Sequence, residues 1–306
     1  MNSPAAAPKA AVPSSERPLF FDLSARVKLR LTGADCFRYL NGQITNDLRK
    51  ATAMTAIQAS LLNAKGKLSA HVFISIEADG AFVLDADPEL RDELPARLER
   101  YIIADDVAIE DVTEQFALFH FTGAAAPNGG AGTRTAAAER FGLPGSDFWC
   151  DRRQSVELQQ SFHAEWESCD QGCAETLRIE RGIPRWGREL TGEIIPVEAN
   201  LEASSIDYGK GCYIGQEVIS RMKMSGQTNK RLCGLVSLSG VALEPEARLT
   251  GEADPAREAG WITSATKSAR LEKEIALGYE KRGHNAPGTR LRAGDIPVEV
   301  VALPFL

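Results

Sequence analysis

Hydrophobic and polar positions along this chain alternate with a period of two in several short runs, which predicts strands. In residues 26–31, Val27, Leu29 and Leu31 fall on one face and basic residues on the other, so we expect a half-buried strand. Four further runs favour strands, at residues 59–62, 68–76, 81–84 and 117–121. In the run 68–76 the apolar residues share one face, and Asp79-Gly80 then favours a hairpin turn.

Other segments have helical spacing. Asp35 is a suitable N-cap for a short helix in which Phe37 and Leu40 are buried and which ends at Asn41-Gly42. Leu90, Leu94, Leu98 and Ile102 form a second apolar stripe, and Pro95 predicts either a kink in this helix or a start close to that residue.

A third helix is expected over residues 175–181, where Gly182 stops it and Pro184 follows. Residues 122–138 are rich in Gly and Ala and are expected to form a loop.

Beyond Lys230 the pattern changes to short strand-like runs separated by Gly and Pro turns, which is typical of a small barrel or sandwich. The length of 306 residues suits roughly two domains. We therefore predict an α+β protein with a disordered tail at 1–17, a larger domain at 18–227 and a β domain at 228–306.

Composition narrows the function. The net charge of −7 argues against non-specific nucleic-acid binding, although a local basic patch for an anion remains possible. The N-terminal residues are rich in Ala, Pro and Ser and lack a secretory signal, and no run is long enough for a membrane helix. We expect a cytoplasmic protein that has no membrane partner.

Six cysteines and four histidines are present, without a CxxC pair, so no metal site is predicted. Cys169 and Cys173 are one helical turn apart, but all the thiols are expected to be reduced.

The most informative stretch is Lys-Gly-Cys-Tyr-Ile-Gly-Gln-Glu at residues 210–217. It holds the thiol of Cys212 between two glycines, and Lys210 and Arg221 would activate this thiol if they lie close to it. The alternative is that Cys212 is a small buried hydrophobic residue.

This stretch, together with Arg221, resembles the signature of the YgfZ-type folate-binding proteins, which support iron–sulfur enzymes. These proteins belong to the glycine cleavage T-protein (GcvT) superfamily and are related to a mitochondrial iron–sulfur assembly factor. Further blocks resemble the same family in the same order, at residues 42–47, 63–67, 181–201 and 260–305.

The resemblance implies a T-protein-like cloverleaf of mixed α/β subdomains around a central channel, followed by a C-terminal β-barrel. It also implies bound tetrahydrofolate or a one-carbon derivative, with iron–sulfur clients or assembly factors as partners. Glu198 is the candidate for pterin recognition with Asn200 nearby, and Glu193 is a competing carboxylate. Further candidates for the folate site are Gln43, Asn46, Gln216, Glu217 and Arg221, with Lys65 and Lys67 for an anionic polyglutamate tail.

Where the T-protein carries its catalytic aspartate, this chain has Ser69 and Ala70, which puts aminomethyl transfer in doubt. We therefore expect a folate-binding accessory protein in which Cys212 is the functional thiol, acting by metal or cluster contact, thiol exchange or attack on a one-carbon unit. One alternative is an aminomethyltransferase that uses His71 or Asp47 instead. The other is a structural folate binder without thiol chemistry.

Overall fold

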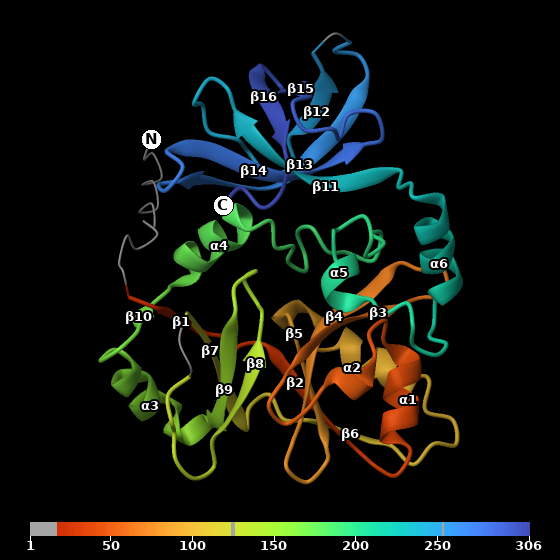
Figure 1. Ribbon diagram of the computed structural model, residues 1–306, viewed down its shortest axis with the longest axis vertical. Helices are drawn as coiled ribbons and strands as arrows, with labels where there is room; N and C mark the ends of the chain where they lie inside the picture. Colours follow the sequence, from red (N-terminus) through yellow and green to blue (C-terminus); the bar gives the residue numbers. More distant parts are fainter. Residues whose placement is uncertain (1–16, 124–125, 253) are drawn as a thin grey trace, which may run out of the picture.

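The computed structural model describes residues 17–123, 126–252 and 254–306, and arranges them as two five-stranded sheets below a closed barrel (Figure 1). Apart from Arg17, the predicted N-terminal tail lies outside the described residues. No helix in the described ranges is long and apolar enough to cross a bilayer.

The first sheet is antiparallel, in the order β3-β4-β5-β2-β6. Its strands are β2 (Val27–Thr32), β3 (Ile57–Leu62), β4 (Leu68–Ile76), β5 (Phe82–Ala86) and β6 (Ala108–Asp111). Helices α1 (Cys36–Gln43) and α2 (Glu93–Glu99) pack on one face and bury the apolar side of β4. Two 3₁₀ turns, Leu48–Lys50 and Pro88–Leu90, complete this subdomain.

The second sheet has the order β10-β1-β7-β9-β8. Its strands are β1 (Leu19–Asp22), β7 (Phe116–Thr122), β8 (Arg134–Ala138), β9 (Gly145–Asp151) and β10 (Glu167–Ser168). The 3₁₀ turn Arg152–Gln154 leads into helix α3 (Ser155–Phe162). This helix inserts Phe162 among the aromatic rings of the sheet, and the ring centroids of Phe162 and Phe121 are 4.9 Å apart. Edge-to-face contacts of this kind stabilise the core beyond the area that they bury.

Three helices lead from the sheets to the barrel: α4 (Gln171–Glu180), α5 (Glu202–Ser205) and α6 (Gln216–Ser225). The closed barrel has the order β11-β14-β13-β12-β15-β16. Its strands are β11 (Lys230–Ser237), β12 (Arg248–Gly251), β13 (Glu258–Ser268), β14 (Lys273–Lys281), β15 (Arg290–Ala293) and β16 (Ile296–Val301).

A fully buried carboxylate joins the barrel to the sheets. Glu189 accepts hydrogen bonds from the hydroxyls of Thr263 (2.7 Å) and Ser264 (2.6 Å) on β13. Its other oxygen accepts from Arg178 on α4 at 3.0 Å and from the backbone N–H of Arg185 at 3.1 Å. Because all four contacts are charge-assisted and the three from side chains are buried, this carboxylate fixes the orientation of the barrel against α4.

The structure confirms the predicted fold class, including the closed C-terminal barrel. The predicted strand 68–76 has the observed bounds of β4, and α2 begins at Glu93, so that Pro95 lies in its first turn, where proline is tolerated. The predicted division at residue 228 falls just before Lys230, where β11 begins, and stays a prediction.

Three local predictions were wrong. Lys28 is buried, because its ammonium group donates to the carbonyl oxygens of Ser24 and Arg26. Phe37 is largely exposed, on the outer side of α1. The expected loop at 122–138 contains β8, whose Ala-rich residues pair with β9 at the edge of the sheet.

The barrel also contains a buried carboxyl group, that of Glu280 on β14. Neither of its oxygens has a hydrogen-bond partner among the described residues, and burial raises the pKa of Glu280 to about 8. In the unfolded chain a glutamic acid titrates near pH ~4.3. Between these two values the unfolded state has released the proton and the folded state has kept it.

We therefore predict that the free energy of unfolding falls as the pH rises from 5 to 8, by up to about 1.4 kcal/mol per pH unit from this group. Glu280→Gln should flatten this dependence, and urea unfolding at several pH values measures it. Glu244→Gln, an exposed substitution in the same barrel domain, is the control. Equal slopes for wild type and Glu280→Gln would contradict the prediction.

Candidate functional site

A cavity of about 550 Å³ lies where the two sheets meet α4 and the loop before α5. Its volume is in the range of small-molecule sites. It combines aromatic and apolar walls with several charged groups. The residues that line this cavity include Phe21, Arg26, His71, Phe73, Glu139, Arg140, Phe141, Cys169, Glu175, Arg178, Arg185 and Asn200.

Strand β4 supplies His71 and Phe73 to the cavity, because successive side chains of a strand point to opposite faces. Ala70 and Val72, which alternate with them, are buried in the core under α1 and α2. The Nδ1 atom of His71 lies 3.4 Å from the hydroxyl oxygen of Ser60. Burial lowers the pKa of His71 to about 4, so its imidazole is neutral at pH 7.

The cavity wall beside Phe73 is formed by Arg140, which joins the two sheets. Its guanidinium donates two hydrogen bonds to Asp85 of β5 (2.9 and 2.6 Å) and two to Asp147 of β9 (both 2.7 Å). All three side chains are at least 97% buried. Burial alone would raise the pKa of Asp147, but Arg140 and His120 hold it at about 2. The guanidinium carbon also lies 4.0 Å from the ring centroid of Phe73.

Helix α4 forms the opposite wall. Arg178 pairs with Glu175 and Glu189, and the Nε atom of Arg185 is buried without a hydrogen-bond partner in the described part of the chain. The nearest carboxylate oxygen to this Nε, on Glu175, is 3.9 Å away, beyond hydrogen-bond distance. The Arg185 side chain as a whole is 35% exposed, so the wall offers a cationic guanidinium group beside the buried Nε.

The expectation that all thiols are reduced was wrong for one pair. Cys169 and Cys173 are joined by a disulfide, and their Cα atoms are 5.4 Å apart. Cys169 directly precedes the N-cap residue Asp170, and Cys173 lies in the first turn of α4, so the two residues meet where the chain enters the helix. The other four cysteines are free thiols.

Of the two residues predicted to recognise the pterin, only Asn200 lines the cavity. Its side-chain amide donates to the carbonyl of Leu232 at 2.8 Å and accepts from Arg231 at 2.7 Å, which ties the cavity wall to the barrel strand β11. Glu198 is buried, but its carboxylate accepts the N–H of Ile195 at 3.2 Å and pairs with Lys230 at 3.3 Å. The role predicted for Glu198 stays a prediction.

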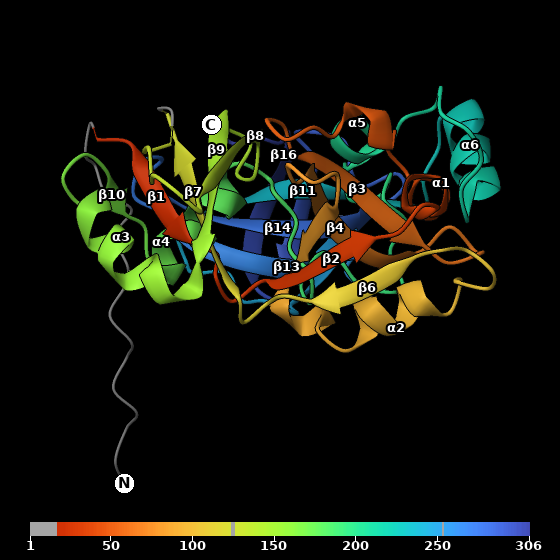
Figure 2. The ribbon, with the colours of Figure 1, turned by 90° about the horizontal axis from the view of Figure 1, so that it is seen from below.

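The motif at 210–217 lies at the outer edge of the first subdomain, as both views show for α6, which follows it directly (Figures 1 and 2). Lys210 donates to the carbonyl oxygens of Asn41 (2.6 Å), Ile44 (2.6 Å) and Asn46 (2.8 Å). All three protons of its ammonium group are therefore used in fixing the end of α1, and burial lowers the pKa of Lys210 to about 8. Cys212 is exposed.

Two family-like loops touch this motif. Gly66 and Gly215 both have positive φ, and a side chain on Gly215 would come within 3.2 Å of the Gly66 Cα and 2.7 Å of the Asn63 carbonyl oxygen. The N–H of Ile214 donates to the carbonyl of Gly42. Thus three of the sequence blocks quoted above are neighbours in space, and both glycines are needed for the close backbone approach.

The other predicted site residues lie near these loops or behind the residues that line the cavity. Gln43 accepts a hydrogen bond from Arg97, and Asn46 donates to the carbonyls of Gln58 and Ser204, which both line the cavity. Gln216 and Glu217 begin α6, where Glu217 forms an exposed ion pair with Arg221. Lys67 pairs with Glu193, and Lys65 is exposed. The described residues that line the cavity do not include the predicted residues Gln43, Asn46, Lys65, Lys67, Glu193, Gln216, Glu217 and Arg221.

One cavity residue outside the quoted motifs has a signal in the sequence. Phe73 is an apolar residue on the face of β4 that otherwise carries Ser69, His71 and Ser75, and such an exception in an alternating strand indicates a contact partner. Arg140, Arg178 and Arg185 carry no comparable signal, because their partners are distant in sequence.

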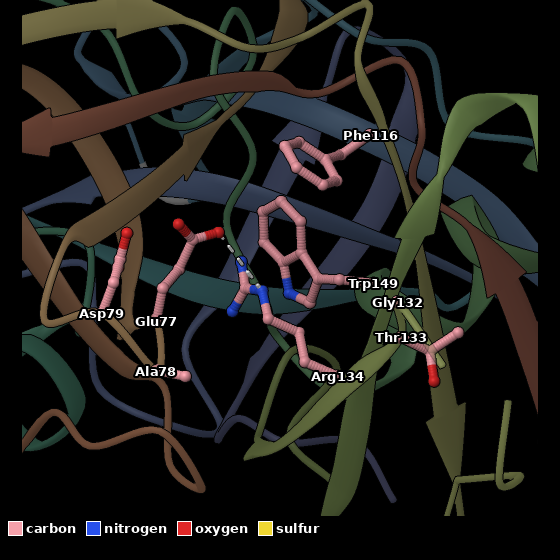
Figure 3. Close-up of a pocket in the computed structure, with 8 residues that line it drawn as sticks. All are labelled: Glu77, Ala78, Asp79, Phe116, Gly132, Thr133, Arg134 and Trp149. Atoms are coloured by element: carbon pink, nitrogen blue, oxygen red, sulfur yellow. Dashed lines mark ion pairs between the residues drawn. The ribbon is translucent and has the colours of Figure 1, made fainter. Parts of the chain in front are cut away.

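A second cavity, of about 300 Å³, lies between the β4–β5 hairpin and the other sheet (Figure 3). There Arg134 covers the indole of Trp149, with its guanidinium carbon 4.1 Å from the ring centroid, and forms an ion pair with Glu77 at 3.8 Å. Arg134 also donates to the hydroxyl of Ser75 at 3.0 Å, and Glu77 is paired with Arg30. Since these charges are already matched, the central cavity is the better candidate site.

Residues 230–306 match the family described as glycine cleavage T-protein C-terminal barrel domain, which covers the observed barrel. The chain is 30% identical to the tRNA-modifying protein YgfZ of Sodalis glossinidius, over 78% of this chain and 77% of that protein. The chain belongs to the YgfZ family, within the GcvT superfamily.

Three other proteins are also similar to this chain. An aminomethyltransferase of Halalkalibacterium halodurans is 24% identical over 93% of this chain and 86% of that protein. The mitochondrial iron-sulfur cluster assembly factor IBA57 homolog of Dictyostelium discoideum is 24% identical, but this chain covers only 61% of its length. The crystal structure of aminomethyltransferase T from Bartonella henselae superposes with a TM-score of 0.83 over 95% of this chain and 86% of that one, at 16% identity, which shows the shared fold.

The buried contacts of Arg140 predict a large loss of stability on substitution. Arg140→Gln leaves Asp85 and Asp147 without their shared cation, and breaking a buried ion pair in this way costs about 3–5 kcal/mol. Chemical denaturation measures the change. As a control, Arg153→Gln removes an exposed ion pair with Asp151 and should leave the free energy of unfolding nearly unchanged. Similar losses for the two variants would rule out the role given to Arg140.

Proposed function

We propose that this protein binds tetrahydrofolate, or a one-carbon derivative of it, in the central cavity and supports iron–sulfur enzymes through the exposed thiol of Cys212. The single observation that carries the proposal is the coexistence, in a YgfZ-family chain, of a 550 Å³ cavity with an exposed cysteine in the family motif outside it. Ligand binding and thiol chemistry are then performed by separate parts of the molecule.

The chemistry of the cavity fits a folate. Phe73 and the stacked pair Phe21–Phe141, whose ring centroids are 4.2 Å apart, offer flat apolar surfaces for a pterin and a benzoyl ring. Glu139 offers a carboxylate that suits the donors of an aminopyrimidine edge. The partly exposed guanidinium of Arg185 suits a carboxylate of the glutamate tail.

The outer position of Cys212 favours a macromolecular partner. The thiol follows Gly211, which has open space around it, and precedes α6, whose residues Arg221, Lys223 and Met224 are exposed. Nothing in this arrangement directs the thiol into the cavity, so its partner is an iron–sulfur client or assembly factor. Because the YgfZ relative is named a tRNA-modifying protein, tRNA-modifying iron–sulfur enzymes are the first clients to test.

Aminomethyl transfer is the second candidate function, favoured by the relative of that name. No carboxylate occupies the positions of Ser69 and Ala70, and the neutral His71 is the nearest titratable side chain of β4 that lines the cavity. A transferase that uses His71 as its base would show glycine-dependent activity with a lipoylated carrier, lost in His71→Gln.

Calorimetric titration with tetrahydrofolate tests the binding site. Phe73→Leu keeps the apolar volume and removes the aromatic face, so we expect affinity to fall about 10-fold, or about 1.4 kcal/mol. Cys212→Ser should bind as tightly as wild type. Glu198→Gln tests the pterin prediction, which requires a loss of about 1–3 kcal/mol. Absence of saturable binding to the folded wild-type protein would exclude the cavity as a folate site.

The role of the thiol is tested in cells that lack this protein. We expect Cys212→Ser to abolish support of an iron–sulfur tRNA-modifying enzyme, measured as the fraction of modified tRNA, while its folate affinity is unchanged. Met224→Ala, an exposed substitution on the adjacent helix, is the control and should restore modification. Full support by Cys212→Ser would eliminate the thiol from the function.

A further inference from the structure

The disulfide between Cys169 and Cys173 lies at the junction of β10 and α4, on the wall of the central cavity. The two sulfur atoms are not equivalent. Both cysteines belong to the buried apolar cluster with Phe21 and Leu177, but only Cys169 is among the described residues that line the cavity. A small molecule in the cavity therefore reaches Cys169 first.

This disulfide adds less to the stability of the fold than one that closes a long loop. It closes a loop of only four residues in sequence separation, and the stabilisation by a disulfide falls as the loop that it closes becomes shorter. The position of this disulfide in the chain therefore gives little support to a purely structural role.

The backbone around the disulfide is held by other contacts. The N–H of Cys169 donates to the carbonyl of Phe20 at 2.9 Å. The N–H of Cys173 donates to the side chain of Asp170 at 2.8 Å, and that of Ala174 to the Asp170 carbonyl at 2.9 Å. These bonds do not depend on the sulfur–sulfur bond, so the disulfide can open without loss of β10 or α4.

The first turn of α4 also makes one sulfur the better leaving group. Cys173 lies within this turn, where the backbone N–H groups and the helix dipole favour a negative charge. Cys169 precedes the N-cap residue Asp170 and lies outside the helix. In thiol–disulfide exchange the sulfur that better bears the charge leaves faster.

From these observations we infer that Cys169–Cys173 is a redox-active disulfide that exchanges with low-molecular-weight thiols of the glutathione class entering the central cavity. This activity uses the cavity proposed for folate, but it requires neither bound folate nor Cys212.

The exchange proceeds in two balanced steps. The thiolate of the first small thiol, having released its proton to solvent, attacks the Cys169 sulfur and forms a mixed disulfide, and Cys173 leaves as a thiolate. A second small thiolate then attacks the sulfur of the first small molecule. The small-molecule disulfide forms, and Cys169 leaves as a thiolate. Both cysteine thiolates take up protons, so two electrons pass from the small thiols to the protein.

The first experiment establishes the disulfide in the full chain, purified without reductant and alkylated under denaturing conditions. Cys169 and Cys173 fall in one tryptic peptide, residues 154–178, which should be lighter than its reduced form by two hydrogen atoms and unalkylated. The same peptide carrying two alkyl groups before reduction would overturn the proposal. Cys36, Cys150 and Cys233, which are buried free thiols, serve as internal standards for alkylation.

The second experiment tests the direction of attack. Oxidised Cys212→Ser protein, which lacks the exposed competing thiol, is treated with limiting reduced glutathione and quenched with N-ethylmaleimide. We expect glutathione on Cys169 and N-ethylmaleimide on Cys173, in at least a 10-fold excess over the reverse pattern. Attachment mainly to Cys173, or no exchange in the folded protein, would overturn the proposal.

Discussion

The arrangement of this molecule depends on one buried cation held by two buried carboxylates. Arg140 comes from the loop after β8, Asp85 from the first sheet and Asp147 from the second, and the three side chains exclude water almost completely. Charges in such surroundings are costly unless geometry is good, and here four hydrogen bonds satisfy the guanidinium. The two sheets can therefore take only the relative position in which these groups meet, and that position creates the cavity.

The molecule has two separate candidate regions, the cavity and the exposed motif, and the sequence motifs do not distinguish them. The cavity is lined by Phe73, Arg140, Arg178 and their neighbours, whereas the most recognisable motif lies outside it and presents Cys212 to solvent. Lys210 belongs to the motif for a structural reason, because its ammonium group holds three carbonyls at the end of α1. These contacts give the lysine a structural role, and its predicted activation of Cys212 stays a prediction.

Much of the fold could be predicted from the sequence, because strand alternation and helix spacing are local. The β4 strand was predicted in this way, and Pro95 indicated either a kink in α2 or its start. For the C-terminal strands the pattern allowed a barrel or a sandwich, and the family resemblance implied the barrel that is observed. The ion network could not be predicted, since Asp85, Arg140 and Asp147 meet only after the two sheets have formed. The disulfide was missed because the sequence shows a helical spacing but not which thiol pairs are oxidised. The candidate site was predicted only in part: Asn200 lines the cavity, and the other quoted side chains surround it or lie at the outer surface.

The Glu189 carboxylate limits which barrel sequences can be combined with the rest of this chain in evolution. Its four donors come from a cavity-wall arginine, a loop backbone and two hydroxyls of the barrel, so the barrel and the cavity share one polar centre. An exchanged barrel that lacks hydroxyls at the positions of Thr263 and Ser264 would leave a buried carboxylate half satisfied. Recombination between relatives would therefore preserve stability only where the incoming barrel keeps these two hydroxyls. The barrel and the cavity wall that it contacts would then be inherited as one unit.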